Sequence, residues 1–253
     1  MLKPEAGKDK LMRDPCIIRG ADGKFHMVWT VSWGERSIGY ASSADLIHWS
    51  AQQAIPVMEN DTSTLNAWAP EIFYDTKRRN YIIYWASTVP GKFPAKGVKP
   101  GGKYNHRMYY VTTQDFSTFT PAKLLYDQGF SVIDATIQQK GNTFIMFLKN
   151  ENDNPPEKNL RIATSLNLYQ GYGFASAPIT GNYWAEGPTV LKNGSKWVVY
   201  FDKYTEHRYG AIESVDLKTW TDVSDKITLP PGIRHGTIVQ VSAAELAPLK
   251  GMD

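Results

Sequence analysis

Three carboxylic residues stand at places where core strands would be expected to begin. Asp14 opens the run DPCII, Asp134 opens DATIQ, and Glu186 opens EGPTVL. Ionised carboxylates are rarely buried without a partner, so three of them in one kind of position need a common explanation. Carboxyl groups held close together are the side chains that general acid and base catalysis uses. Their chemistry therefore depends on whether the fold brings the three strand starts to one place.

The chain repeats one pattern of strands, and the repeat predicts the fold. Strand starts lie near residues 14, 71, 134, 186 and 235, at intervals of roughly 50–60 residues. Each of the first four is followed by an apolar strand, a turn, an aromatic strand and a third strand ending in a shared tag, such as YASSADLIHW or AIESVDLKTW. Turns between such runs indicate antiparallel hairpins. A period of this length with three or four strands per unit predicts an all-β fold, a five-bladed β-propeller.

The repeat places residues 1–253 in a single β-propeller domain that carries the catalytic acids and whose fifth blade is incomplete. His235 would begin the innermost strand of that blade, but too few residues follow it to supply further strands. Two interpretations stay open: four blades with a lone strand, or a fifth blade whose outer strands lie outside this sequence. In the second case an oligomer could cover the open blade.

The innermost strands of a propeller run in the same direction, so their starts meet at one mouth of the central channel. Asp14, Glu71, Asp134, Glu186 and His235 should therefore converge there. Long polar loops on one face usually carry binding, and the connections after each second strand should rim this mouth. These connections are residues 31–37, 89–106, 150–159 and 202–209. A second set of acids recurs inside the shared tag, where they should hydrogen-bond their own turns: Asp45, Asp115 and Asp216.

The composition excludes several classes of protein. The net charge is +3 without a block of basic residues, so a nucleic-acid partner is not expected. The apolar runs are too short to cross a membrane, and Cys16 is the single cysteine, so no internal disulfide can form. Met1 is not followed by an apolar signal segment, which makes the chain cytoplasmic as written unless a leader is missing.

The strand starts resemble those of a known family. RDP, WAPE, DAT, EGP and HGT, in this order and at this spacing, are similar to motifs of glycoside hydrolase family 43, over residues 11 to about 242. The resemblance implies a five-bladed propeller that hydrolyses arabinose-, xylose- or galactose-containing glycans with inversion of configuration. RDPCIIRGADGKFHMVW and DKYTEHRYGA resemble a branch with exo-acting α-L-arabinofuranosidases and galactofuranosidases.

The resemblance also implies roles for the residues that match the motifs. Asp14 matches the general base, Glu186 the general acid, and Asp134 the acid that tunes the pKa and orientation of its neighbours. His235 matches a histidine close to a central water or metal site, so a structural calcium ion there is a further expectation. No cofactor is required for the reaction, and no Cys/His cluster has the spacing of a zinc site.

Substrate contacts are expected from aromatic and polar residues near the same mouth. Trp33 and Trp68 could stack on a sugar face, although aromatic residues in strands are more often part of the core. Arg208 could bind sugar hydroxyls or balance the acids, while Glu71 and His207 could equally be structural. The predicted substrate-binding residues are Trp33, Trp68, Glu71, His207, Arg208 and His235.

These observations predict an inverting exo-glycosidase whose partner is a carbohydrate substrate. The preferred activity is that of an α-L-arabinofuranosidase, which releases terminal arabinose from plant polysaccharide side chains. The alternatives are a β-D-galactofuranosidase, a β-xylosidase, or a non-catalytic propeller that binds sugar. A related clan of fructan hydrolases is disfavoured because its NDPNG and EC segments are absent here.

Overall fold

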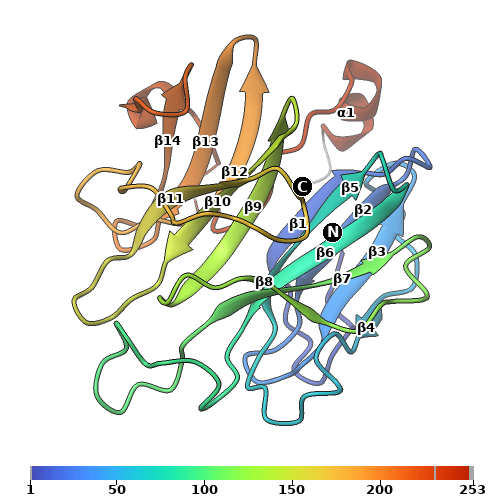
Figure 1. The fold of residues 1–253 in the computed structure, drawn as a ribbon. Helices are drawn as coiled ribbons and strands as arrows, with labels where there is room; N and C mark the ends of the chain where they lie inside the picture. The colour runs from blue at the N-terminus through green and yellow to red at the C-terminus, as the bar shows by residue number, and fades with distance from the viewer. Residues whose placement is uncertain (1, 231, 251–253) are drawn as a thin grey trace.

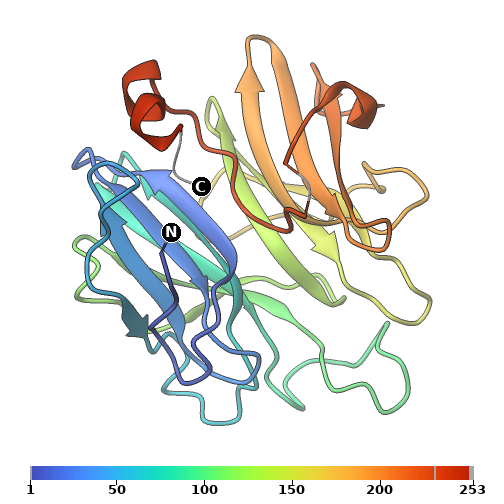
Figure 2. The same ribbon diagram turned by 180° about the vertical axis from the view of Figure 1, so that it is seen from behind.

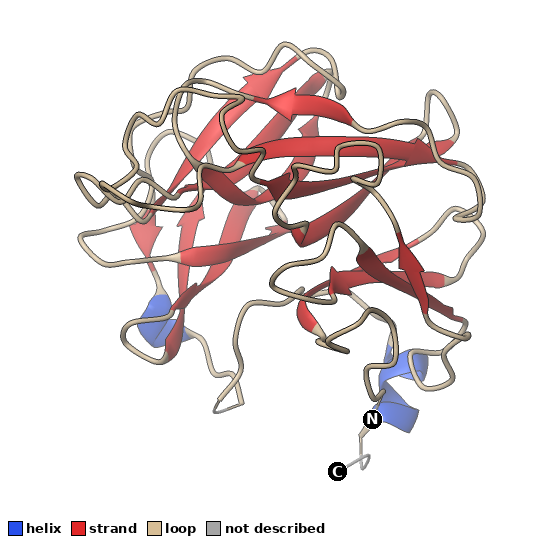
Figure 3. Cartoon of the chain, turned by 90° about the horizontal axis from the view of Figure 1, so that it is seen from below, coloured by secondary structure: helices blue, strands red, loops and turns tan. Residues whose placement is uncertain are grey.

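The computed structural model describes residues 2–230 and 232–250, which form four antiparallel sheets arranged as the blades of a β-propeller (Figure 1, Figure 2). The innermost strand of each sheet packs against that of the next sheet from the first to the fourth. Strands make up nearly all of the regular structure, and the two short helical segments lie at its edge (Figure 3). The all-β propeller expected from the repeat is therefore confirmed. None of the helices in these ranges is both long and apolar enough to cross a membrane.

Each sheet follows the order of the chain from its innermost strand outward. The first contains β1 (Arg13–Arg19), β2 (Phe25–Thr30), β3 (Ile38–Ser43) and β4 (Gln53–Ile55). The second contains β5 (Trp68–Asp75), β6 (Asn80–Ser87), β7 (Arg107–Thr113) and β8 (Lys123–Tyr126). The third contains β9 (Val132–Lys140), β10 (Thr143–Asn150) and β11 (Asn159–Ser165). The fourth contains β12 (Glu186–Asn193), β13 (Lys196–Lys203), β14 (Arg208–Ser214) and β15 (Thr221–Asp222), and is followed by the 3-10 helix η1 (Ser224–Lys226) and by α1 (Ala243–Leu249).

The aromatic second strands supply most of the core between neighbouring blades. Every residue of β2 is buried, and one cluster joins Val28 of β2 to Trp85 of β6. A second cluster joins Tyr84 of β6 to Met146 of β10, and a third joins Phe147 to Phe201. Burying one such side chain stabilises the fold by about 1.5–3 kcal/mol. The blades therefore hold one another in place and fix the positions of their inner strands.

The acids of the shared tag form turns as expected. Asp45 Oδ1 accepts hydrogen bonds from the backbone N–H groups of Ile47 and His48, at 2.9 and 2.7 Å. Asp115 and Asp216 accept the same pair of bonds from the residues two and three positions further on. These acids accept hydrogen bonds from backbone N–H groups in turns. Their role is therefore structural and differs from that of the acids on the inner strands.

The predicted strand beginning at His235 is wrong, and the described residues form four blades rather than five. Residues 235–242 contain no strand, because no neighbouring strand in the described ranges pairs with their backbone. The segment nevertheless lies between the first and fourth blades. Thr237 Oγ1 donates to Pro15 O at 2.8 Å and accepts from Ile17 N at 3.2 Å. On the other side, Ile238 N donates to Thr189 Oγ1 at 3.2 Å.

Candidate active site

All four inner strands carry a β-bulge close to where they begin. The pairing register shifts within the first four residues of β1, β5 and β12, and β9 is bulged opposite Phe147 and Lys149. A bulge bends its strand and re-aims a side chain, which is why bulges are frequent beside active sites. The residue of each bulge has a positive φ: Asp14 at 52°, Ala69 at 46°, Asp134 at 51° and Gly187 at 59°. Asp14 and Asp134 therefore occupy equivalent positions in their blades, and Glu186 stands one residue earlier in its own.

His235 joins the two bulge acids into one cluster. Its Nδ1 lies 3.4 Å from Asp14 Oδ1 and 3.9 Å from Asp134 Oδ2. Asp14 also accepts a hydrogen bond from Thr30 Oγ1 at 3.0 Å, and Asp134 accepts one from the backbone N–H of Gly187 at 3.2 Å. The last bond brings Glu186, the neighbour of Gly187, beside the same cluster. The strand starts of three blades and the 235–242 segment therefore meet at one place.

The environment of this cluster shifts the pKa values of its two aspartates in opposite directions. Burial raises the pKa of Asp14, but the charge and hydrogen bond of His235, together with the Thr30 hydroxyl, outweigh burial and hold it below its usual range. Burial, with the charges of Glu186 and Asp14, raises the pKa of Asp134 to about 6, although His235 opposes the shift. One aspartate is thus kept ionised and the other is inclined to hold a proton.

His235 itself is a buried cation. Burial lowers the pKa of its imidazole, but the charges of Asp134 and Asp14 outweigh burial and raise it to about 10. The imidazolium therefore lies among carboxylates at the centre of the site. Calcium requires six to eight oxygen ligands, and no group of three or more His, Cys, Asp or Glu side chains in residues 2–230 and 232–250 is arranged to hold a metal ion. The calcium ion expected near His235 stays a prediction.

Glu186 lies between two cations and is partly exposed. Its carboxylate is 3.0 Å from Lys149 Nζ, and Arg234 Nη2 is 3.9 Å away. Arg234 is held in turn by Asp202, whose Oδ2 accepts from its Nε at 2.6 Å. The Glu186 side chain keeps 23% of its surface exposed, so a substrate can reach it. The buried Lys149 on β10 contacts Glu186 directly, and the buried Asp202 on β13 acts on it through Arg234.

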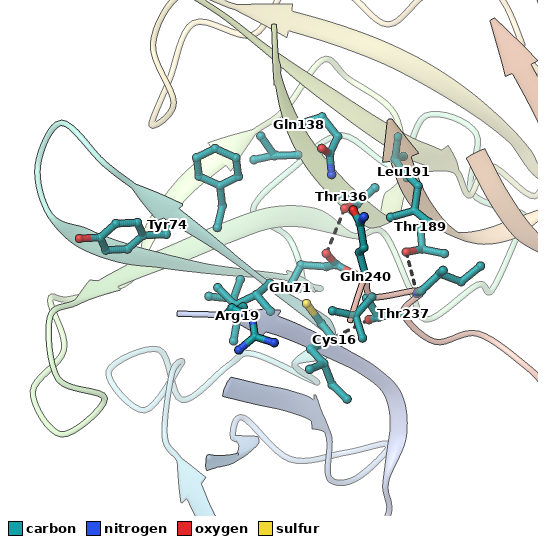
Figure 4. Close-up of a pocket in the computed structure, with 18 residues that line it drawn as sticks. Cys16, Arg19, Glu71, Tyr74, Thr136, Gln138, Thr189, Leu191, Thr237 and Gln240 are labelled. Carbon is teal, nitrogen blue, oxygen red and sulfur yellow. Dashed lines mark hydrogen bonds between the residues drawn. The ribbon is translucent and has the colours of Figure 1, made fainter. Parts of the chain in front are cut away.

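The repeat predicted that Glu71 would lie at the same level as Asp14, but the structure places Glu71 deeper in the channel. Ala69 occupies the bulge of β5, and Glu71 comes two residues deeper. Its Oε2 accepts a hydrogen bond from Thr136 at 3.0 Å, inside a channel cavity of about 300 Å³ lined by the four inner strands and residues 237–240 (Figure 4). Burial raises the pKa of Glu71 to about 7, although the charge of His235 opposes the shift. The repeat misled because a bulge changes which residue faces the mouth.

Trp33 and Trp68 form an aromatic pair on the first two blades. Their rings meet edge to face with centroids 5.6 Å apart, and 48% of the Trp33 surface is exposed. The Arg13 guanidinium lies 5.3 Å from the centroid of Trp33. Behind them, Trp68 packs against Tyr104 and His106, with centroids 4.7 and 5.0 Å away. Ala69, the neighbour of Trp68, donates its N–H to Thr30 Oγ1 at 2.8 Å, and Thr30 donates to Asp14, so the start of β5 adjoins the acid cluster.

His207 and Arg208 line a different hollow. Arg208 Nε donates to Glu206 at 2.8 Å, and its side chain is half exposed. Both residues line a surface hollow of about 260 Å³ beside β14, and the loop after η1 contributes Ile227, Leu229, Pro230, Gly232 and Ile233 to it. Their role in substrate binding stays a prediction, since the structure assigns Arg208 an acidic neighbour instead.

Sequence reasoning missed the residues that support the acids from the second strands. Thr30, Lys149 and Asp202 pair in register with the starts of β1, β9 and β12, opposite Arg13, Ile133 and Glu186. Each is polar and buried at the end of an apolar, aromatic strand. A charged residue closing such a run, as in FIMFLK and WVVYFDK, is the signal that could have identified Lys149 and Asp202.

Comparisons with known proteins agree with this geometry. A family model described as "Probable glycosyl hydrolase domain", from the relatives of glycoside hydrolase family 43, matches residues 1–247. An α-L-arabinofuranosidase from Bifidobacterium longum subsp. longum is 27% identical over 160 residues, which cover 55% of this chain. The match spans only 15% of that longer relative.

Solved structures show the same fold at low sequence identity. An α-L-arabinofuranosidase from Lactobacillus brevis superposes with a TM-score of 0.64 at 19% identity, covering 84% of this chain and 72% of the other. An exo-β-1,3-galactanase from Phanerochaete chrysosporium gives 0.63 at 15% identity, covering 84% and 50%. With the family model matching almost the whole length and the acids gathered at the strand starts, this chain belongs to glycoside hydrolase family 43.

Proposed function

We propose that this chain is an inverting, exo-acting α-L-arabinofuranosidase that releases terminal arabinose from plant polysaccharide side chains. The observation that carries the proposal is the grouping of Asp14, Asp134 and Glu186 around His235 in an order of motifs resembling that of such enzymes. The names of the Bifidobacterium and Lactobacillus relatives favour arabinose as the sugar. The galactanase among the similar structures makes a galactose-containing glycan the second candidate, and a β-xyloside the third.

The proposed reaction needs two carboxyl groups and one water. Asp14 is held ionised by His235 and Thr30, so it takes a proton from a water that attacks the anomeric carbon. The bond from that carbon to the glycosidic oxygen breaks, its electron pair stays on the oxygen, and the oxygen receives a proton from Glu186. Asp134 places a charge or a shared proton beside Glu186 and orients it through Gly187. No cofactor takes part in this scheme.

A substitution at Glu186 tests the proposal. For a substrate with a poor leaving group, Glu186→Gln should lower kcat by about 10²–10⁴-fold, because the leaving oxygen is no longer protonated. An activated aryl arabinofuranoside needs little protonation, so its rate should fall by less than about tenfold. Asp14→Asn should depress both substrates alike, and Glu213→Gln on β14 serves as the matched control. Equal losses on both substrates for Glu186→Gln would count against its role.

The stereochemistry and the products test the remaining parts. NMR of the first product should show the anomer opposite to that of the substrate, since a single displacement inverts configuration. Early release of monosaccharide from a polymer supports exo action, whereas early oligosaccharides would contradict it. A panel of aryl arabinofuranosides, galactofuranosides and xylosides ranks the three candidate sugars.

We also propose that residues 235–242 are the innermost part of a fifth blade. They run between β1 and β12, where the inner strand of such a blade would lie, and their contacts there come from Thr237 and Ile238. Pairing of this segment with further strands, from a second copy or from another stretch of polypeptide, would complete the ring. Light scattering on residues 1–253 tests the first source, because a monomer at all concentrations excludes it.

A further inference from the structure

Lys149 is a buried cation in direct contact with the acid of the proposed reaction. Only 3% of its side-chain surface is exposed, and its Nζ lies 3.0 Å from Glu186 and 2.7 Å from Glu151. The ring of Tyr204 packs 4.7 Å from the same nitrogen. A buried ammonium group is costly unless it is paired, so these contacts keep it charged.

The carboxylates determine the charge state of Lys149. Burial lowers its pKa, but the charges of Glu151, Glu186 and Asp134 outweigh burial and raise it above the usual range. Lys149 is therefore an ammonium cation at every pH at which the enzyme can work. An acid next to a permanent cation is stabilised as its carboxylate, which is the form that Glu186 takes after it has given up its proton.

Glu186 faces charged groups on every element packed around it. Lys149 from β10 and Arg234 from the following segment attract negative charge. Asp134 from β9 and Asp202 from β13 repel it, and each is itself partly neutralised, by His235 and by Arg234 respectively. Of the two cations, Lys149 lies nearer to the Glu186 carboxylate, at 3.0 Å against 3.9 Å for Arg234.

We infer that Lys149 is a positioning residue that fixes the Glu186 carboxyl group and sets its strength as the acid of the reaction. This inference rests on the proposed role of Glu186. Lys149 draws the carboxyl toward β10 and stabilises the carboxylate left when the proton moves to the leaving oxygen. Asp134 carries a like charge and therefore acts on the Glu186 carboxylate in the opposite direction. The pair thus adjusts one acid from two sides.

A second buried lysine offers a matched control. Lys158 is also buried and shares Glu151 with Lys149, with Nζ 2.7 Å from Glu151 Oε1 and 2.7 Å from Asp153. Neither of these two ion pairs involves Glu186. Removing Lys158 therefore tests the cost of losing a buried lysine from the same cluster without touching the acid.

The experiment measures kcat/KM against pH for Lys149→Met, Lys149→Arg and Lys158→Met, with circular dichroism as the test of folding. For Lys149→Met, the alkaline limb of the kcat/KM–pH profile should shift to higher pH by about one pH unit or more, because Glu186 loses its nearest cation. At the new optimum the rate on a poor leaving group should fall by about tenfold or more, and that on an aryl glycoside by less. Lys149→Arg should keep the limb in place, and Lys158→Met should leave it unshifted even if it melts earlier.

The outcomes separate this inference from the proposed function. An unshifted limb in folded Lys149→Met overturns the inference, as does an equal shift in Lys158→Met. If Lys149→Met does not fold, Glu151→Gln decides instead: it frees Lys149 for Glu186 and should move the limb to lower pH, and an unchanged limb overturns the inference. Glu186→Gln, assayed beside these variants, shows whether Glu186 is the acid at all. If Glu186→Gln slows substrates with poor and with activated leaving groups equally, the proposed function itself is refuted.

Discussion

Glu71 differs from the other inner-strand acids because it lies inside the channel and not beside the mouth. Its carboxyl is half-buried, it accepts from Thr136, and burial raises its pKa to about 7 from an ordinary value of 4.5. A group whose folded pKa is raised stabilises the fold fully below its unfolded pKa. That contribution is lost as the pH rises toward the folded value. The window for Glu71 therefore runs from about pH 4.5 to about pH 7.

Glu71→Gln should remove this pH dependence. The amide keeps a partner for Thr136 but cannot ionise, so the variant avoids the loss that the wild type suffers. Between pH 4.5 and pH 8, the unfolding free energy of the variant should gain about 2–3 kcal/mol relative to wild type. Urea denaturation at four pH values measures the difference, and Glu59→Gln at an exposed position is the control. Parallel curves for variant and wild type would show that Glu71 does not titrate in this range.

At the scale of elements, the bulges at the strand starts decide which side chains meet. Gly187 is the bulge residue of β12, with φ 59°, and its N–H binds Asp134. A Cβ at this position would lie 2.4 Å from the ring of His235, closer than atoms can approach. The glycine therefore allows the start of β12 to pack against the histidine. Gly194, in the far turn of the same sheet, has the same φ of 59° but open space around it.

Gly187→Ala and Gly194→Ala form a pair that separates the two effects. Both should lose about 1–2 kcal/mol of stability, because an L-residue is strained at positive φ. Gly187→Ala should lose more, and should lower kcat by about 100-fold or more, since His235 must move and His235 holds the acids. Thermal melting and steady-state rates measure both effects. Similar activity in the two variants would mean that the contact of Gly187 with His235 is not required for catalysis.

At the scale of the whole molecule, the 235–242 segment lies between the first and fourth blades and connects them by hydrogen bonds, and we call this junction the seam. Thr237 links the 235–242 segment to β1 across most of the chain length, through bonds to Pro15 and Ile17. The same segment carries His235 into the site and lines the channel. Stability and activity are therefore coupled at this seam of the propeller.

Thr237→Val should weaken the seam. The isosteric change leaves the backbone N–H of Ile17 and the carbonyl of Pro15 without their partner, which should cost about 1–3 kcal/mol of stability. Limited proteolysis should then cut within residues 232–250 faster than in wild type, while Thr237→Ser, which keeps the hydroxyl, should behave like wild type. Unchanged melting and proteolysis in Thr237→Val would show that other contacts close this side.

The sequence alone determined the repeat, the propeller class, the family and the acids worth testing. These are local properties: alternating apolar and aromatic runs, turn residues and short motifs that recur along the chain. They located Asp14, Asp134 and Glu186 because each lies within a motif at a strand start.

Only the tertiary structure decided what surrounds those acids. The bulges placed Glu71 in the channel rather than at the mouth, and a bulge depends on how two strands pair, which a motif does not specify. Lys149 reaches Glu186 from a different blade, and the ion pair joins residues 37 positions apart. The predicted fifth inner strand did not form because a strand exists only with a partner. Such contacts arise from packing between segments distant in sequence, so neither spacing nor composition could reveal them.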